Sequence, residues 1–222
     1  IDAVMGRTKH RPVSDGTVAP VNALIFALII GSLGILILSI WANPLTAWLT
    51  FASIIGYAVI YTIYLKRATP QNIVIGGIAG AAPPLLGWVA VTGNIDPNSL
   101  LLVAIIFAWT PPHFWALCIA KKSEYAEAGI PMLPVTHGEE YTRLQMLLYT
   151  VLMIVVTVLP YLSGMSGVWY LIGVSLINLR FLMLLKNHFD TKRAEEAMDL
   201  FWYSIRYIMW LFVFLLVDHF AY

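Results

Sequence analysis

Residues 20–41 read PVNALIFALIIGSLGILILSIW, a run of 22 residues without a charged side chain. A helix needs about 20 mainly apolar residues to cross a bilayer, and unpaired backbone groups in lipid cost several kcal/mol each, so such a run is expected to be helical. Six similar runs follow, and the seven lie at about 20–41, 46–65, 72–92, 99–119, 144–162, 167–186 and 199–217. The sequence therefore predicts an all-α fold, a polytopic transmembrane helical bundle that forms a single intramembrane domain over residues 1–222.

The composition agrees with a membrane protein, because 60% of the 222 residues are hydrophobic and only 11% are charged. A soluble domain has about 25% charged residues. The sequence contains no Walker-type glycine loop, CxxC, HExxH or GxSxG motif, which argues against nucleotide hydrolysis, thiolate zinc and triad hydrolysis. The net charge of +1 gives no reason to expect a nucleic-acid partner. The single cysteine, Cys118, is expected to be a small buried apolar residue.

The Lys and Arg residues gather in alternate loops. Arg180 and Arg206 lie inside predicted helices, in the halves nearest one side of the membrane. The loops and helix ends on that same side contain Arg7, Lys9, Arg11, Lys66, Arg67, Lys121, Lys122, Arg143, Lys186, Lys192 and Arg193. The other loops, 42–45, 92–99 and 163–167, contain none. By the positive-inside rule the basic side faces the cytoplasm. The sequence therefore predicts a multi-pass protein of the bacterial inner membrane, or of the mitochondrial inner membrane in a eukaryote.

Small residues and prolines mark the third and fourth predicted helices. Residues 76–82 read GGIAGAA and include a Gly-xxx-Gly spacing, which lets a neighbouring element approach closely. Pro83-Pro84 follows, and Pro111-Pro112 lies within the fourth run. Proline removes intrahelical hydrogen bonds and bends a helix. We expect both pairs to interrupt their helices and to shape a cavity.

A polar face is expected at the end of the fourth helix. If residues 112–124 are helical, then His113, Lys121 and Glu124 share one face, and His113 lies about 12 Å deeper than Lys121. Ionisable groups inside a bilayer are candidates for function, although a packing role for His113 is the alternative. The acidic pairs Glu139-Glu140 and Glu195-Glu196 are expected to be solvated.

The basic clusters have two explanations. They can be topology signals that contact anionic lipid headgroups. They can also bind a phosphorylated substrate, with a carboxylate that holds Mg²⁺.

Three blocks, IDAVMGRTKHRP, YLKRATPQNIVIGGIAGAAPPLLGWVAVTG and WTPPHFWAL…SEYAEAGIPMLPV, resemble the protoheme IX farnesyltransferases, a family within the UbiA-like intramembrane prenyltransferases. The resemblance covers essentially the whole chain and implies a nine-helix fold, of which the seven runs match helices three to nine. Asp2 matches the last Asp of the family's Asn-xxx-Asp-xxx-Asp motif, so the rest of that motif and two helices are expected before Ile1. Glu124-Tyr125 stands where the family usually has Asp-Tyr.

The resemblance implies transfer of a farnesyl group from farnesyl diphosphate to a vinyl group of haem b, which gives haem O for terminal oxidases. It assigns Asp2 and Glu124 to Mg²⁺ or another divalent cation, and Lys121 to catalysis with them. It assigns Arg7, Arg11, Lys66, Arg67 and Lys122 to the diphosphate, and His113 and Tyr125 to the haem acceptor. Haem A synthase or a terminal oxidase assembly is the expected protein partner.

Two alternatives remain at this stage. The first is prenyl transfer to a quinone precursor or another aromatic acceptor. The second is a membrane transporter or a haem-binding scaffold, although transporters often contain internal repeats and none is evident in this sequence.

Overall fold

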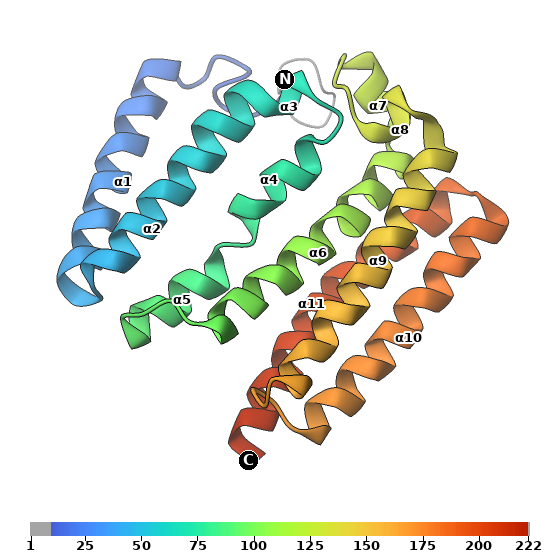
Figure 1. The fold of residues 1–222 in the computed structure, drawn as a ribbon. Helices are drawn as coiled ribbons and strands as arrows, with labels where there is room; N and C mark the ends of the chain where they lie inside the picture. Colours follow the sequence, from blue (N-terminus) through green and yellow to red (C-terminus); the bar gives the residue numbers. More distant parts are fainter. Residues whose placement is uncertain (1–9, 222) are drawn as a thin grey trace.

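The protein is an all-helical bundle, as predicted. A computed structural model describes residues 10–221, apart from the side chain of Arg67. Its elements are α1 (Pro20–Trp41), α2 (Pro44–Ile55), the π-helix η1 (Gly56–Leu65), α3 (Lys66–Ala68), α4 (Asn72–Gly80), α5 (Pro83–Thr92), α6 (Pro97–Ala120), α7 (Lys122–Glu127), α8 (Leu133–Thr136), α9 (Gly138–Leu162), α10 (Val168–Thr191) and α11 (Ala194–Ala221) (Figure 1). They provide seven segments that are long and apolar enough to cross a membrane.

Three helices extend well beyond the apolar runs from which they were predicted. α9 begins at Gly138, α10 continues to Thr191 and α11 begins at Ala194. The added turns are polar, and charged side chains three or four residues apart pair within them, for example Arg143 with Glu139 and Glu140. Such pairs stabilise helices in water, so the helices continue past the hydrocarbon layer.

The core lies around α6, which packs against α4 and α5 on one side and against α9 and α11 on the other. α10 completes this part of the fold by packing against α9 and α11. We call α6, α9, α10 and α11 the packed bundle. Its largest fully buried side chains include Trp115, Tyr170, Phe181 and Tyr207.

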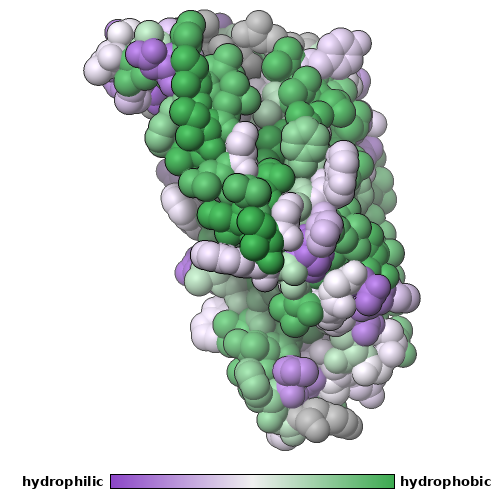
Figure 2. All heavy atoms as spheres, turned by 90° about the vertical axis from the view of Figure 1, so that its left-hand side faces the viewer, coloured by the Kyte–Doolittle hydropathy of each residue, from purple (hydrophilic) through white to green (hydrophobic). Residues whose placement is uncertain are grey.

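The first part of the chain is far less buried. α1 has no buried residue, and in α2 the buried residues are Thr46 and Ala47. We call α1, α2 and η1 the open layer. Figure 2 shows the side of the molecule on which this layer lies, and much of that surface is hydrophobic. Such a surface suits contact with lipid.

The two proline pairs have different effects. α4 ends at Gly80 and α5 begins at Pro83, so the first pair follows a break, as predicted. The predicted interruption at Pro111-Pro112 is wrong, because α6 continues through both residues. Neighbouring helices and hydroxyl groups can support a proline inside a membrane helix. Here α4, α9 and α11 surround α6, and the Thr110 hydroxyl donates a hydrogen bond to the Ile106 carbonyl at 2.7 Å.

The glycines of α4 allow close approach by side chains. A Cβ atom at Gly76 would overlap the Tyr61 ring of η1, and one at Gly77 would lie 3.2 Å from a methyl group of Thr110 on α6. A Cβ at Gly80 would meet no atom within 4 Å in the described part of the chain. The close contact therefore uses Gly76 and Gly77 rather than both ends of the Gly-xxx-Gly spacing.

The two ends of the bundle differ in charge. α3, α7, α8 and the beginning of α9 lie at one end of the bundle, which we call the basic end, and the turns α1–α2, α5–α6 and α9–α10 lie at the other (Figure 1). The lysines and arginines of the loops belong to the first set of elements and to the α10–α11 corner.

Candidate functional site

The polar residues assigned from sequence lie mainly at the basic end. Lys66 and Arg67 begin α3, while Lys121, Lys122, Glu124 and Tyr125 lie at the junction of α6 and α7 and within α7. Asp2 and Arg7 lie outside the described residues. The structure therefore brings two cation-bearing corners to one end of the bundle and leaves the first acidic motif undescribed.

The helix that was expected to carry His113, Lys121 and Glu124 on one face breaks at Lys121. This residue ends α6 with φ −116° and ψ 27°, and α7 begins at Lys122. The predicted continuous face is therefore wrong beyond Ala120. Because the chain turns here, the Lys121 ammonium lies 2.9 Å from a Glu124 carboxylate oxygen, and both side chains are partly exposed. The rim of the site contains a neutralised pair rather than separate charges.

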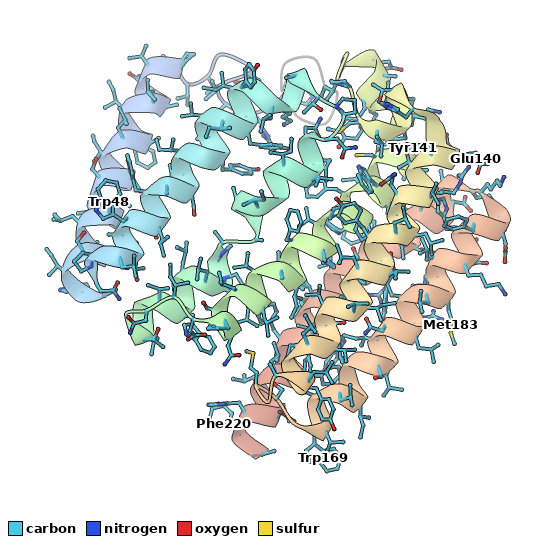
Figure 3. The ribbon with its side chains drawn as sticks, viewed as in Figure 1. Trp48, Glu140, Tyr141, Trp169, Met183 and Phe220 are labelled. Atoms are coloured by element: carbon cyan, nitrogen blue, oxygen red, sulfur yellow. The ribbon has the colours of Figure 1, made fainter. Side chains whose placement is uncertain are left out.

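Lys122 belongs to a larger ion-pair network. Its ammonium lies 3.1 Å from Glu139, whose other carboxylate oxygen lies 3.4 Å from the Arg143 guanidinium. Arg143 also contacts Glu140 at 3.1 Å, and Glu140 contacts Lys192 at 2.6 Å. The network links α7, α9 and the α10–α11 corner, and Figure 3 shows Glu140 at the beginning of α9, beside that corner.

Arg143 is the centre of this network. It is only 3% exposed, and its Nε atom has no hydrogen-bond partner among the described residues. Glu140 is exposed, as expected, whereas the Glu139 side chain is only partly exposed, and both also form ion pairs with Arg143. The network fixes α7 against the packed bundle.

His113 lies deeper in α6 and is 8% exposed. Its ring stacks between Trp109 and Phe201, with centroid distances of 4.3 Å and 4.6 Å. Its Nδ1 atom lies 2.6 Å from the Ser204 hydroxyl, which itself donates to the Phe201 carbonyl at 2.6 Å. Because that hydroxyl proton is used, Nδ1 is the donor to Ser204 and Nε2 has the free lone pair.

The other assigned residues differ in environment. Tyr125 is buried at 7% exposure, and Arg11 is exposed in the turn before α1. The Lys66 carbonyl accepts a hydrogen bond from the Asn72 amide at 3.4 Å, and Asn72 is completely buried. Asn72 thus ties the short α3 to the beginning of α4, and it holds the backbone from which Lys66 projects.

One of the two residues assigned to a divalent cation, Glu124, lies among the described residues. Glu124 has a partly exposed carboxylate at the rim, and Mg²⁺ is commonly held by one or two carboxylates together with substrate phosphates. Within residues 10–221 no group of three or more His, Cys, Asp or Glu side chains could hold a metal ion. The carboxylate of Glu124 therefore fits a cation shared with a diphosphate.

The sequence matches a known family. The family model described as the UbiA prenyltransferase family matches residues 1–205. This chain belongs to the UbiA prenyltransferase family. Among curated members, protoheme IX farnesyltransferase of Teredinibacter turnerae is 58% identical over 222 residues, which are 100% of this chain and 71% of the relative. Protoheme IX farnesyltransferase 1 of Pseudomonas putida is 59% identical over 220 residues, 99% of this chain and 74% of the relative.

Solved structures show the same UbiA fold. A structure from work on digeranylgeranylglyceryl phosphate synthase in membranes superposes with a TM-score of 0.80 at 18% identity, over 96% of this chain and 75% of that one. A UbiA homologue from Aeropyrum pernix gives a TM-score of 0.76 at 17% identity, over 98% and 80% of the two chains. At these identities the comparison supports the fold alone.

Sequence reasoning missed several contacts in this UbiA-family site. Ser204 and Phe201 on α11 hold His113, and the Trp109 indole donates to the Ser204 carbonyl at 2.8 Å. No local pattern indicates a contact across so many residues. Arg143 could have been found, because Glu139 and Glu140 precede it by four and three residues, the spacing at which helical side chains pair.

Proposed function

We propose that this protein transfers a farnesyl group from farnesyl diphosphate to a vinyl group of haem b, with addition of water, to make haem O. The observation that carries the proposal is 58% identity, over the entire chain, to a protein named protoheme IX farnesyltransferase. The protein is an enzyme of the UbiA prenyltransferase family and a multi-span membrane protein. No feature of the described structure favours a quinone precursor, transport or a scaffold role.

The chemistry requires diphosphate to leave an allylic carbon. Lys66, Arg67, Arg11 and Arg7 are the proposed cations for its oxygens, since charge-assisted hydrogen bonds to phosphate are strong. As the allylic cation forms, negative charge grows on the departing diphosphate, and fixed cations stabilise it. The farnesyl carbon then bonds to the haem vinyl group, and water adds its oxygen to the resulting cation and releases a proton.

The Lys121–Glu124 pair has a defined part in this proposal. At 2.9 Å the two charges neutralise each other when no substrate is bound. When substrate binds, Glu124 would hold the divalent cation and Lys121 would bind a phosphate oxygen. The exchange leaves no unpaired charge at the rim. Lys122 is held by Glu139 at 3.1 Å, and we propose that it anchors α7 in addition to facing the diphosphate.

Magnesium, or another divalent cation, would supply charge neutralisation at the leaving diphosphate. Glu124 and Asp2 are the proposed ligands. The Lys122–Glu139–Arg143 contacts hold α7, and with it Glu124, at the basic end.

His113 is proposed to face the acceptor. With Nδ1 donating to Ser204, the ring presents only a lone pair at Nε2. A lone pair can bind the haem iron, whereas it would repel a propionate carboxylate. Of the two roles considered for His113, the hydrogen-bond arrangement therefore favours iron ligation. Buried Tyr125 is proposed to contact the acceptor from α7.

The basic end is proposed to face the cytoplasm, by the positive-inside rule. Farnesyl diphosphate would reach the charged rim from water, and the farnesyl chain and porphyrin would lie in the apolar bundle. Haem A synthase or a terminal oxidase assembly is the proposed recipient of the product.

The primary experiment is mass spectrometry of haem extracted from cells with and without the gene. Loss of haem O in the deletion strain, restored by the gene, supports the proposal. An unchanged haem pool contradicts it, and incubation of membranes with quinone precursors then tests the aromatic-acceptor alternative.

The site assignments are tested by separating the two substrates. Glu124→Gln should lower Mg²⁺-dependent turnover by about 100-fold and leave the spectrum of bound haem unchanged. His113→Ala should change haem affinity or the haem spectrum while farnesyl diphosphate still binds. Wild-type haem affinity, spectrum and turnover in His113→Ala would mean that His113 has only a packing role.

The cation assignments have their own test. Arg11→Gln and Arg67→Gln should each weaken farnesyl diphosphate binding about tenfold with little effect on haem binding. Lys186→Gln is the matched control, because Lys186 lies at the same end of the bundle but was not assigned to the diphosphate. Unchanged diphosphate affinity in both arginine variants would identify these residues as topology signals.

A further inference from the structure

Two arginines lie inside membrane-spanning helices, away from the proposed catalytic site. Arg180 belongs to α10 and Arg206 to α11, and both side chains are exposed. Toward the basic end, the next charged residue after Arg180 is Lys186 on α10, and the next one after Arg206 is Asp199 on α11. At 1.5 Å per residue, Arg180 and Arg206 lie about 9 Å and about 11 Å farther into the apolar part of the bundle. The two arginines therefore lie at similar depths.

Their helical neighbours are exposed apolar side chains. Met183, one turn from Arg180, is 51% exposed and points away from the bundle in Figure 3. Trp202 and Met209, one turn either side of Arg206, are 56% and 64% exposed. Since residues three and four apart share a helix face, each arginine is a single charge on an otherwise apolar surface.

Tyr203 lies between Arg206 and α10. The Arg206 guanidinium carbon lies 6.0 Å from the centre of the Tyr203 ring, and the Tyr203 hydroxyl donates to the Ile177 carbonyl at 3.0 Å. Ile177 is one turn from Arg180 on α10. Tyr203 therefore links the Arg206 side chain on α11 to the turn of α10 that precedes Arg180.

Neither arginine has an acidic partner among the described residues: the ion pairs of α10 and α11 are those of Lys192 and Arg193 near the corner. A topology signal requires cations only in the loop, and Lys186, Lys192 and Arg193 already provide these. Charges inside a membrane span are costly and usually have a partner. An anion from outside the described fold would meet this requirement.

We propose that Arg180 and Arg206 bind the phosphodiester group of an anionic phospholipid on the outer surface where α10 and α11 meet. Arginine side chains bind phosphate with two parallel hydrogen bonds and extend toward the headgroup layer from apolar positions. The exposed apolar side chains beside them suit the acyl chains. Basic sites between helices at the cytoplasmic side are known to select anionic lipid headgroups.

The site is separate from the proposed farnesyl diphosphate site. His113 contacts Phe201 and Ser204 on one side of α11, whereas Tyr203 contacts Ile177 of α10. The Lys121–Glu124 rim lies on α6 and α7, and these helices are absent from the arginine surface. Lipid binding can therefore be measured without catalysis.

The test is native mass spectrometry of the purified protein in neutral detergent. The probes are phosphatidylglycerol and, as a phosphate-free control with the same acyl chains, diacylglycerol. The variant Arg180→Gln with Arg206→Gln should bind phosphatidylglycerol about tenfold more weakly and bind diacylglycerol unchanged. Lys186→Gln, which removes one loop cation from α10, should stay within about twofold of the wild type.

Further variants and competitors distinguish the sources of the anion. Arg180→Lys with Arg206→Lys should restore only part of the affinity, because lysine lacks the planar fork. Millimolar inorganic phosphate and saturating farnesyl diphosphate should not displace the lipid. Wild-type lipid affinity in the double glutamine variant, an equal loss in Lys186→Gln, or displacement by farnesyl diphosphate would each overturn the proposal.

Discussion

The packed bundle and the open layer differ more in their contacts than in their hydrophobicity. α1 is the most apolar of the seven spans and has no buried residue, whereas half of the apolar window of α6 is buried. In lipid, apolar surface gains little by turning inward, and helices associate through close packing and hydrogen bonds. High hydropathy therefore identifies a membrane helix but does not identify a core helix.

Polar side chains mark the packed bundle. The Tyr207 hydroxyl donates to Asn178, whose amide donates to Thr157 at 3.1 Å, and the Tyr170 hydroxyl donates to the Thr157 carbonyl at 2.7 Å. This chain of buried groups joins α9, α10 and α11. Hydrogen bonds between helices stabilise a bundle in the absence of water, so substitutions should affect the two regions unequally.

The largest contrast is expected between two phenylalanines. Phe181 is fully buried against Tyr203 and Tyr207, so Phe181→Ala should lower the free energy of unfolding by about 3 kcal/mol through the cavity that it leaves. Phe26→Ala on α1, where Phe26 is 66% exposed, should change it by less than about 0.5 kcal/mol. Denaturant titration of the detergent-solubilised protein measures both. Equal losses would remove the distinction between the two regions.

The ion-pair network should give the next effect. Arg143→Met removes the buried guanidinium that separates Glu139 from Glu140 and should cost about 2 kcal/mol. Arg193→Met, which breaks only the exposed 3.7 Å contact with Glu196, should cost less than about 0.5 kcal/mol. Thermal unfolding compares them. A small effect in Arg143→Met would mean that the network does not hold α7.

The third largest effect is expected from a side chain of one helix that caps another helix. Asp218 of α11 is buried and accepts hydrogen bonds from the backbone amides of Gly167 and Tyr170 at the beginning of α10. Asp218→Ala should cost about 1–2 kcal/mol, as the loss of a helix cap does, and Asp218→Asn should recover part of it. In the open layer Asn43 caps α2 through the Thr46 amide, and Asn43→Ala should cost about 1 kcal/mol. A greater loss for Asn43→Ala would reverse the comparison.

The smallest effect concerns the seam between the open layer and α4. Gly76→Ala should cost about 1 kcal/mol, because its methyl group displaces the Tyr61 ring. Gly80→Ala, which meets open space, should be neutral or slightly stabilising, since alanine favours helices. Melting temperatures of the two variants measure this difference in stability, and identical values would show that the Tyr61 ring moves aside without cost.

The sequence predicted what depends on local composition. Hydropathy identified all seven spans, and the alternation of basic loops predicted which helix ends lie together. It did not predict the turn at Lys121 or the continuous α6 through Pro111 and Pro112. Both outcomes depend on neighbours that are remote in sequence, such as Glu139 for Lys122 and the helices that surround α6.

The candidate site was predictable to a similar extent. Lys66, Lys121 and Glu124 were assigned to the candidate site because the chain places them next to apolar runs, and their roles stay predictions. Their partners were not: the Lys121–Glu124 pair follows from the turn, and the Ser204 contact with His113 joins helices that are far apart in the sequence. The periodicity of apolar residues describes one helix at a time, so it does not predict contacts between helices.

The π-helix η1 has a consequence for insertions and deletions. It occupies Gly56–Leu65 and leads directly into Lys66. A π-turn accommodates one residue more than an α-turn, so the direction in which Lys66 points depends on how many residues the wide turns absorb. Deleting one residue from η1 and replacing the wide turn with a regular α-turn would leave α3 in nearly the same direction, whereas the same deletion within a regular α-helix would rotate everything after it by about 100° about the helix axis. The wide turns therefore let this segment differ in length by one residue without turning Lys66 away, and a family member with one residue fewer here should have a regular α-helix in place of η1.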